Sequence, residues 1–175
     1  MLLYILGGLA AVIVLIILFA STRPSTFSLV RSTTIGASPD RVFPLINDFH
    51  KWSDWSPWEK IDPAMKRAFT GPESGVGAAY SWDGNNKAGA GSMQITRSDM
   101  PNKVDINLNF TRPFKANNLT EFTTAPSGNS TVVTWKMSGP LDLFGKVFHL
   151  FVNMEKMVGT DFEKGLASMK AIAER

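Results

Sequence analysis

The hydrophobic pattern of the chain begins with an unbroken apolar run. From Leu2 to Ala20 no residue is charged, and the Tyr4 hydroxyl is the only polar side-chain group. An α-helix rises about 1.5 Å per residue, so about 20 apolar residues cross a hydrocarbon core of about 30 Å. The run therefore predicts one transmembrane helix, which contacts the membrane through residues 2–20.

Two other interpretations fit this run less well. A cleaved signal peptide usually has a basic start, about 7–15 apolar residues and small residues before the cut. Here no Lys or Arg precedes the run, and its end, Leu18-Phe19-Ala20-Ser21-Thr22, contains no small-x-small site. A buried core helix is disfavoured because the segment is apolar on every face. The pattern favours a membrane anchor over both.

The polarity of the chain divides it into three parts. Residues 1–21 form the predicted anchor, residues 22–26 a short polar linker, and residues 27–175 a globular domain. Arg23 and Arg31 follow the apolar run, and no basic residue precedes it. Because positive charges favour the cytoplasmic side of a membrane, this asymmetry leans toward a single-pass protein with a cytoplasmic domain.

From residue 27 onward the pattern predicts strands and short helices. Residues 27–37 are rich in β-branched residues, which is typical of a strand. Ser38 and Pro39 then indicate a helix start, with Ser38 as the N-cap, and Pro44 should limit or bend this helix. Six further strands are predicted over residues 65–70, 76–82, 89–97, 103–111, 116–124 and 131–137.

The alternation within these strands predicts how the sheet is buried. Residues 104–110 alternate Val, Ile, Leu and Phe with Asp and Asn, so that one face is apolar and the other is wet. Residues 141–174 carry apolar residues at spacings of three and four, which predicts a long amphipathic helix, although its glycines weaken the case for a straight one. We expect an α+β fold in which a curved antiparallel sheet of about seven strands wraps around this C-terminal helix.

Composition narrows the possible functions. Hydrophobic residues make up 44% of the 175 residues, which is enough for a core, and the net charge of +3 is too small and scattered to indicate nucleic-acid binding. Cysteine is absent, which excludes disulfides, thiolate metal sites and a cysteine nucleophile. The two histidines, His50 and His149, have no acidic cluster at ligand spacing. We therefore expect no metal and no cofactor.

Four motifs resemble those of a known group of proteins. They are Ala-Ser-Pro-Asp-Arg-Val-Phe at 37–43, Trp-Ser-Asp-Trp-Ser-Pro-Trp at 52–58, Gly-Pro-Glu-Ser-Gly-Val-Gly at 71–77, and Asp-Phe-Glu-Lys-Gly-Leu at 161–166. With the order of elements, they resemble the helix-grip fold of the START and birch-pollen-allergen superfamily. Within it, residues 27–173 resemble bacterial polyketide cyclase/dehydrase-like proteins of the SRPBCC group.

The resemblance implies a hydrophobic ligand cavity under the long helix, but no single activity. Members of the superfamily include lipid carriers, hormone receptors, cyclases, metal-dependent hydroxylase domains and chaperone regulators, so the fold alone does not choose among them. The apolar residues that we expect to line a pocket are Trp52, Trp55, Trp58, Tyr80, Trp82, Phe110, Phe122, Trp135, Phe151, Met154 and Val158. Each of these is also an ordinary core residue type.

Three functions follow from these features. The first is a membrane-anchored module that binds a hydrophobic or lipid-like small molecule between the sheet and the C-terminal helix. The second is an enzyme of cyclase, dehydratase or hydrolase type acting on such a molecule, which requires a titratable group in the pocket. The carboxylates that could serve are Asp54, Glu59, Glu73 and Asp161. The third is a protein-interaction domain similar to chaperone regulators. No catalytic constellation is recognisable.

Overall fold

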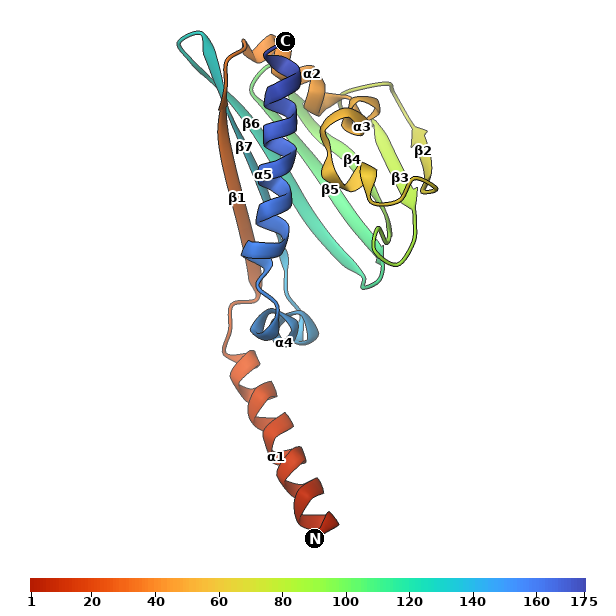
Figure 1. The fold of residues 1–175 in the computed structure, drawn as a ribbon, viewed down its shortest axis with the longest axis vertical. Helices are drawn as coiled ribbons and strands as arrows, with labels where there is room; N and C mark the ends of the chain where they lie inside the picture. Colours follow the sequence, from red (N-terminus) through yellow and green to blue (C-terminus); the bar gives the residue numbers. More distant parts are fainter.

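The computed structural model describes residues 1–175 as an α+β domain joined to one projecting helix (Figure 1). The helices are α1 (Leu2–Ser21), α2 (Pro39–Asn47), η1 (Phe49–Lys51), α3 (Trp52–Trp55), η2 (Pro57–Lys60), α4 (Leu143–Phe151) and α5 (Met154–Ala173). The strands are β1 (Thr26–Ile35), β2 (Lys66–Thr70), β3 (Ala79–Asp83), β4 (Ala90–Asp99), β5 (Lys103–Arg112), β6 (Ala116–Ser127) and β7 (Ser130–Pro140). The predicted fold class and seven-stranded sheet are confirmed.

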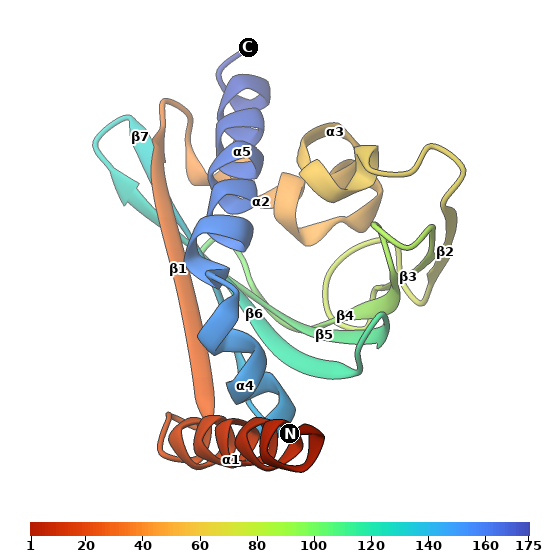
Figure 2. The ribbon, with the colours of Figure 1, turned by 60° about the horizontal axis from the view of Figure 1, so that its bottom comes forward.

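All seven strands belong to one antiparallel sheet in the order β1-β7-β6-β5-β4-β3-β2. The first strand therefore pairs with the last, and these two strands are farther apart in the sequence than any other pair of neighbours in the sheet. The sheet curves around α5, and the chain end of α5 lies opposite the end where α1 projects (Figures 1 and 2). Residues opposite one another on neighbouring strands share a face, so the register defines an apolar face toward α5 and a polar face toward solvent.

The strand β3 begins later than the pattern predicts. Residues 76–78 belong to the preceding loop, and Val76 is exposed. Gly75 and Gly77 adopt positive φ values of 79° and 92° in this loop, a conformation that favours glycine over any residue with a side chain. These two glycines therefore shape the turn between β2 and β3, and β3 begins only at Ala79.

The helix α2 begins as the sequence predicts, with Ser38 at the N-cap and Pro39 in the first turn. The Ser38 side chain makes no capping hydrogen bond, however, so only the position of the cap is borne out. Pro44 lies inside α2, which continues for three residues beyond it to Asn47. Val42, Phe43 and Ile46 are buried, so α2 closes the end of the sheet farthest from α1.

The C-terminal helical segment is divided into α4 and α5. The break lies at Val152 and Asn153, which have extended backbone conformations, and not at one of the glycines. The Asn153 side chain accepts a hydrogen bond from the Lys156 N–H and so caps α5. Gly159 and Gly165 lie within α5 and are buried, because close neighbours leave no room for a side chain there.

Candidate functional site

The interior between the sheet and α5 is filled mainly by aromatic rings. Trp135 on β7 stacks on Phe162 of α5 with ring centres 3.9 Å apart, and lies 4.8 Å from Phe122 of β6. Trp52 and Trp55, the first and last residues of α3, pack edge-on against Trp135 and Phe122, with ring centres 6.4 and 5.5 Å from that of Trp135. We refer to these five residues as the aromatic core. Four of the predicted pocket residues thus meet in one contact group.

The remaining predicted pocket residues lie around this group. Trp58 of η2 is half-buried at its edge, 5.6 Å from Trp135. Tyr80, Trp82 and Phe110 form a second set at the β3 side, where Trp82 lies 6.1 Å from Tyr80 and 5.7 Å from Phe110. At the other side, Met154 and Val158 are half-buried and Phe151 is exposed. Phe151 therefore points away from the interior in which we expected it.

The polar tips of the buried aromatic residues are bonded, with one exception. The Trp52 Nε1–H donates to the Ile46 carbonyl at 3.0 Å, and the Trp55 Nε1–H donates to the Leu45 carbonyl at 2.8 Å. Trp135 is 2% exposed, and its Nε1–H has no acceptor. A buried N–H without an acceptor is rare in folded proteins and calls for a specific explanation.

A second unpartnered polar atom lies on the same face of the sheet. Thr120 of β6 is 3% exposed, and its hydroxyl makes no hydrogen bond. Thr124, four residues along the same strand and equally buried, donates its hydroxyl proton to the Pro101 carbonyl. In the register Phe122 pairs with Trp135, which makes Thr120 a diagonal neighbour of Trp135. Two unsatisfied groups thus face the interior from adjacent strands.

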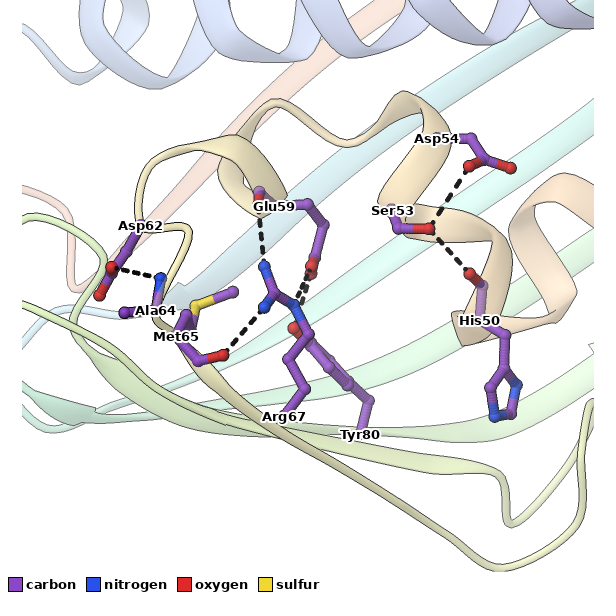
Figure 3. Close-up of polar contacts among 9 residues, drawn as sticks. All are labelled: His50, Ser53, Asp54, Glu59, Asp62, Ala64, Met65, Arg67 and Tyr80. Atoms are coloured by element: carbon purple, nitrogen blue, oxygen red, sulfur yellow. Dashed lines mark hydrogen bonds and ion pairs between the residues drawn. The ribbon is translucent and has the colours of Figure 1, made fainter.

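One predicted carboxylate is buried in a polar cluster at the edge of the interior (Figure 3). Glu59 accepts a 2.6 Å hydrogen bond from the Tyr80 hydroxyl and a 2.7 Å bond from Arg67 Nε. The Glu59 side chain is 8% exposed. Burial first, and then the neighbouring Glu59, raise the pKa of Tyr80 well above its ordinary value because both disfavour a phenolate. Both carboxylate oxygens are engaged, so Glu59 acts as a bonded structural anion.

The other predicted carboxylates do not join this cluster. Asp54 is exposed on α3 and points away from Glu59 (Figure 3). Asp161 of α5 pairs with Lys164 at 3.1 Å on the outside of the helix. Glu73 is exposed and lines a hollow of about 320 Å³ together with His50 and Phe69. No group of three or more His, Asp or Glu side chains could hold a metal ion.

Arg31 is part of the domain and does not flank the apolar helix as a free charge. From β1 it crosses α5 at Gly159 and pairs with Glu163 at 2.7 Å and Glu155 at 2.9 Å. A Cβ atom at Gly159 would overlap the Arg31 guanidinium, so the absence of a side chain at this position allows Arg31 to cross α5. Of the two arginines behind the cytoplasmic prediction, only Arg23 stands beside α1.

A group of apolar residues that the sequence pattern does not predict lies at the end of the domain nearest α1. Phe114, in the turn between β5 and β6, lies 5.1 Å from Phe144 and 6.2 Å from Phe148 of α4. Phe114 is 54% exposed and Phe144 is 55% exposed. One signal could have revealed this group: a phenylalanine directly after Pro113 lies in a predicted turn, where a buried position is not expected.

The N-terminal segment forms the predicted helix. α1 is one helix that is long and apolar enough to cross a membrane, and nearly all of its side chains are exposed. Ala20 is the exception, with 0% exposure, because the last turn of α1 contacts α4. The apolar surface of α1 is therefore uncovered by the rest of the chain except at its end.

Comparisons with known proteins agree with this architecture. Residues 26–174 match the family described as polyketide cyclase/dehydrase and lipid transport. Major latex-like protein 151 from Panax ginseng has a TM-score of 0.62 at 14% identity, over 87% of this chain and 100% of that chain. The Aha1 dimer from Colwellia psychrerythraea has a TM-score of 0.61 at 16% identity, over 85% and 96%.

A third solved structure, the Mll3558 protein from Rhizobium loti, has a TM-score of 0.60 at 20% identity, over 83% of this chain and 96% of that chain. At such identities the likeness establishes the helix-grip fold and nothing about activity. No protein of curated function matches the chain in sequence.

Proposed function

The chain belongs to the polyketide cyclase/dehydrase and lipid transport family, and from this premise we propose that it is a membrane-anchored domain that binds an apolar, lipid-like molecule between its sheet and α5. The observation that carries the proposal is the pair of unpartnered polar atoms, Trp135 Nε1 and Thr120 Oγ1, both buried on the inner face of the sheet. An oxygen of a bound molecule would accept from the indole N–H and exchange a hydrogen bond with the hydroxyl.

The walls around these two atoms suit an apolar chain. On the row of the sheet that contains Thr120, the register pairs Leu29 with Met137, Met137 with Thr120 and Thr120 with Ile106. Every neighbour of Thr120 on this row is apolar, and methionine adapts to irregular shapes. This row is closer to α4 than the row of Trp135, so the proposed binding region lies on the α4 side of the aromatic core.

The orientation of the Trp135 ring supports this placement. The Cζ3 edge of the ring faces Gly165, where a Cβ atom would lie 3.0 Å away. In an indole ring Nε1 lies on the edge opposite Cζ3, so the N–H points away from the close contact with α5. Binding would therefore satisfy the indole without separating Trp135 from Gly165 or Phe162.

We suggest that α1 anchors the domain in the membrane that supplies the ligand. The helix is long enough to span a bilayer, and its apolar surface has no cover within the chain. The linker between α1 and β1 comprises residues 22–25, so the interior stays near the lipid phase.

The two threonines of β6 provide a test with a built-in control. Full-length protein is reconstituted in phosphatidylcholine nanodiscs, and energy transfer from tryptophan to dansyl-labelled undecanoic acid is measured. Thr120→Val removes an unpaired hydroxyl, so it should leave the ligand-free stability unchanged or raise it, yet weaken probe binding about three- to tenfold. Thr124→Val removes a bonded hydroxyl and should cost about 1 kcal/mol of stability with binding retained.

Equal probe affinity for the wild type and Thr120→Val would contradict the proposed site. Native mass spectrometry of the purified full-length protein supplies an independent measurement, because a lipid held in the interior should appear as an added mass that organic extraction removes. Absence of both energy transfer and a bound lipid would overturn the proposed function itself.

A further inference from the structure

We propose that α4 and the β5–β6 turn rest in the surface of the bilayer that α1 crosses, and so hold the domain in one fixed orientation on the membrane. The contact surface is the phenylalanine patch, which consists of Phe114, Leu143, Phe144, Phe148 and Phe151. The inference rests on the membrane anchor of the proposed function and adds a second, peripheral contact with lipid.

The patch is apolar and open to the surroundings. Leu143 is 47% exposed, Phe144 55%, and Phe151 71%, and no residue of α4 is buried. Phe144, Phe148 and Phe151 follow one another at spacings of four and three, which places them along one stripe of the helix. Phe114 joins the stripe from the β5–β6 turn. A contiguous exposed apolar surface of this kind marks an interaction site.

The position of the patch identifies its occupant. The last turn of α1 contacts α4, and this contact buries Ala20 completely. The Leu141 N–H, just before α4, donates to the Ser25 carbonyl at 2.7 Å and ties the start of α4 to the linker. When α1 spans a bilayer, its end at Ser21 lies at the membrane surface. A helix that contacts this end must lie near the same level, and Figure 1 shows α4 next to the end of α1 that joins the domain.

The chemistry of the patch also suits a lipid surface. Its four aromatic residues are all phenylalanines, which have no polar atom to satisfy when they enter the acyl region. Lys115 follows Phe114 in the chain, and Lys146 lies two residues from both Phe144 and Phe148, on the face of α4 opposite the stripe. Helices that lie in the plane of a membrane combine such an apolar face with basic residues on the polar face. The helix α4, which carries most of the patch, contacts α1 directly, and this favours the bilayer over a separate partner.

The absence of cysteine allows single labels to be placed without background. Phe144→Cys and Phe151→Cys are labelled with the fluorophore NBD in the full chain, reconstituted in vesicles of phosphatidylcholine and phosphatidylglycerol. Two control positions accompany them. Val12→Cys lies in α1, and Ser127→Cys lies at the end of β6, next to the β6–β7 turn, which is at the end of the domain opposite α1. Quenching is measured with nitroxide-labelled lipid and, separately, with aqueous iodide.

We expect nitroxide lipid to remove most of the emission at positions 144, 151 and 12 and to leave position 127 bright. Emission at 144 and 151 that survives while position 12 is quenched would overturn the peripheral contact and leave the anchor intact. Survival at position 12 as well would overturn the anchor on which the proposed function depends. Protection of 144 from both quenchers would mean that protein covers the patch, which also overturns the proposal. Unchanged circular dichroism verifies that each labelled variant is folded.

Discussion

The domain uses aromatic side chains in two opposite ways at its two ends. The aromatic core, around Trp55 and Trp135, is buried under α3 and α5, whereas the phenylalanine patch around Phe144 faces outward beside α1. The core is rich in tryptophan, and most of its polar tips are pinned to a backbone carbonyl. The aromatic residues of the patch are all phenylalanines, whereas the core combines three tryptophans with Phe122 and Phe162. Of the two groups, only the buried one contains N–H groups that need an acceptor, and the exposed one has no polar atom to satisfy in a lipid environment.

Hydrogen bonding also distinguishes Trp135 from the other two tryptophans of the aromatic core. A tryptophan in a finished core has its N–H bonded, as Trp52 and Trp55 do. Trp135 is as deeply buried as Trp52 and Trp55, but its indole N–H has no hydrogen-bond acceptor. A ligand atom that accepts a hydrogen bond from this N–H would satisfy a buried donor that the folded chain leaves unpaired.

The largest expected effect comes from opening the aromatic core. Trp55 is 1% exposed, contacts the rings of Trp52, Trp135 and Phe122, and donates to Leu45. Trp55→Ala should therefore lower the free energy of unfolding by about 3–5 kcal/mol, as for other large aromatic residues cut back to alanine in a core. The urea midpoint of the full chain in detergent measures the loss. A change below about 1 kcal/mol would mean that the core is loosely packed.

A smaller effect should follow from Tyr80→Phe at the edge of the core. The substitution removes the hydrogen bond to the Glu59 carboxylate, which should cost about 1–2 kcal/mol at neutral pH. Because burial raises the pKa of Tyr80 in the folded protein, the unfolded chain releases this proton first as the pH rises past about 10. Stability contributed by Tyr80 is thus complete below pH 10 and declines above it.

Urea unfolding of the wild type and Tyr80→Phe between neutral pH and pH 11 tests this sign. The difference in free energy between the two proteins should narrow as the pH rises above about 10. A difference that stays constant across this range would show that Tyr80 ionises in the folded protein as readily as in the unfolded chain, and a difference that widens would show that it ionises more readily when folded.

The smallest effect on stability is expected in the patch. Phe144→Ser removes an aromatic ring of the same kind as those in the core, but from a position that is 55% exposed. In detergent the free energy of unfolding should change by no more than about 0.5 kcal/mol. A loss comparable to that of Trp55→Ala would show that α4 is an integral part of the folded core, and would end the distinction between the two groups.

Much of the fold follows from local pattern, and the site does not. Alternation in residues 104–110 identifies both the strand β5 and its buried face, because a period of two fixes which side chains share a side. The pattern does not predict the division between α4 and α5, because the apolar spacing continues across Val152 and Asn153. The start of α5 depends instead on a capping bond that the Asn153 side chain accepts from the Lys156 N–H. Periodicity reports the faces of a helix, but not whether its axis changes direction.

The candidate binding groups depend on pairing between strands far apart in the sequence. Thr120 and Thr124 have the same residue type and the same place in the alternating pattern, and only the position of Pro101 distinguishes the bonded hydroxyl from the free one. The exposure of Phe144 likewise depends on what α5 and the sheet leave uncovered. Hydrogen-bond partners and side-chain exposure of this kind are set by contacts between segments far apart in the sequence, which a local pattern does not contain.

The linker between α1 and the sheet has a consequence for how a bound molecule could be exchanged. Residues 22–25 can extend by at most about 14 Å, at roughly 3.3–3.6 Å per residue. With α1 in a bilayer, the domain cannot leave that bilayer to reach a distant one. Under the proposed function, the domain would take a ligand from its own membrane and present it there to an enzyme or carrier, and it would not carry the ligand across an aqueous compartment.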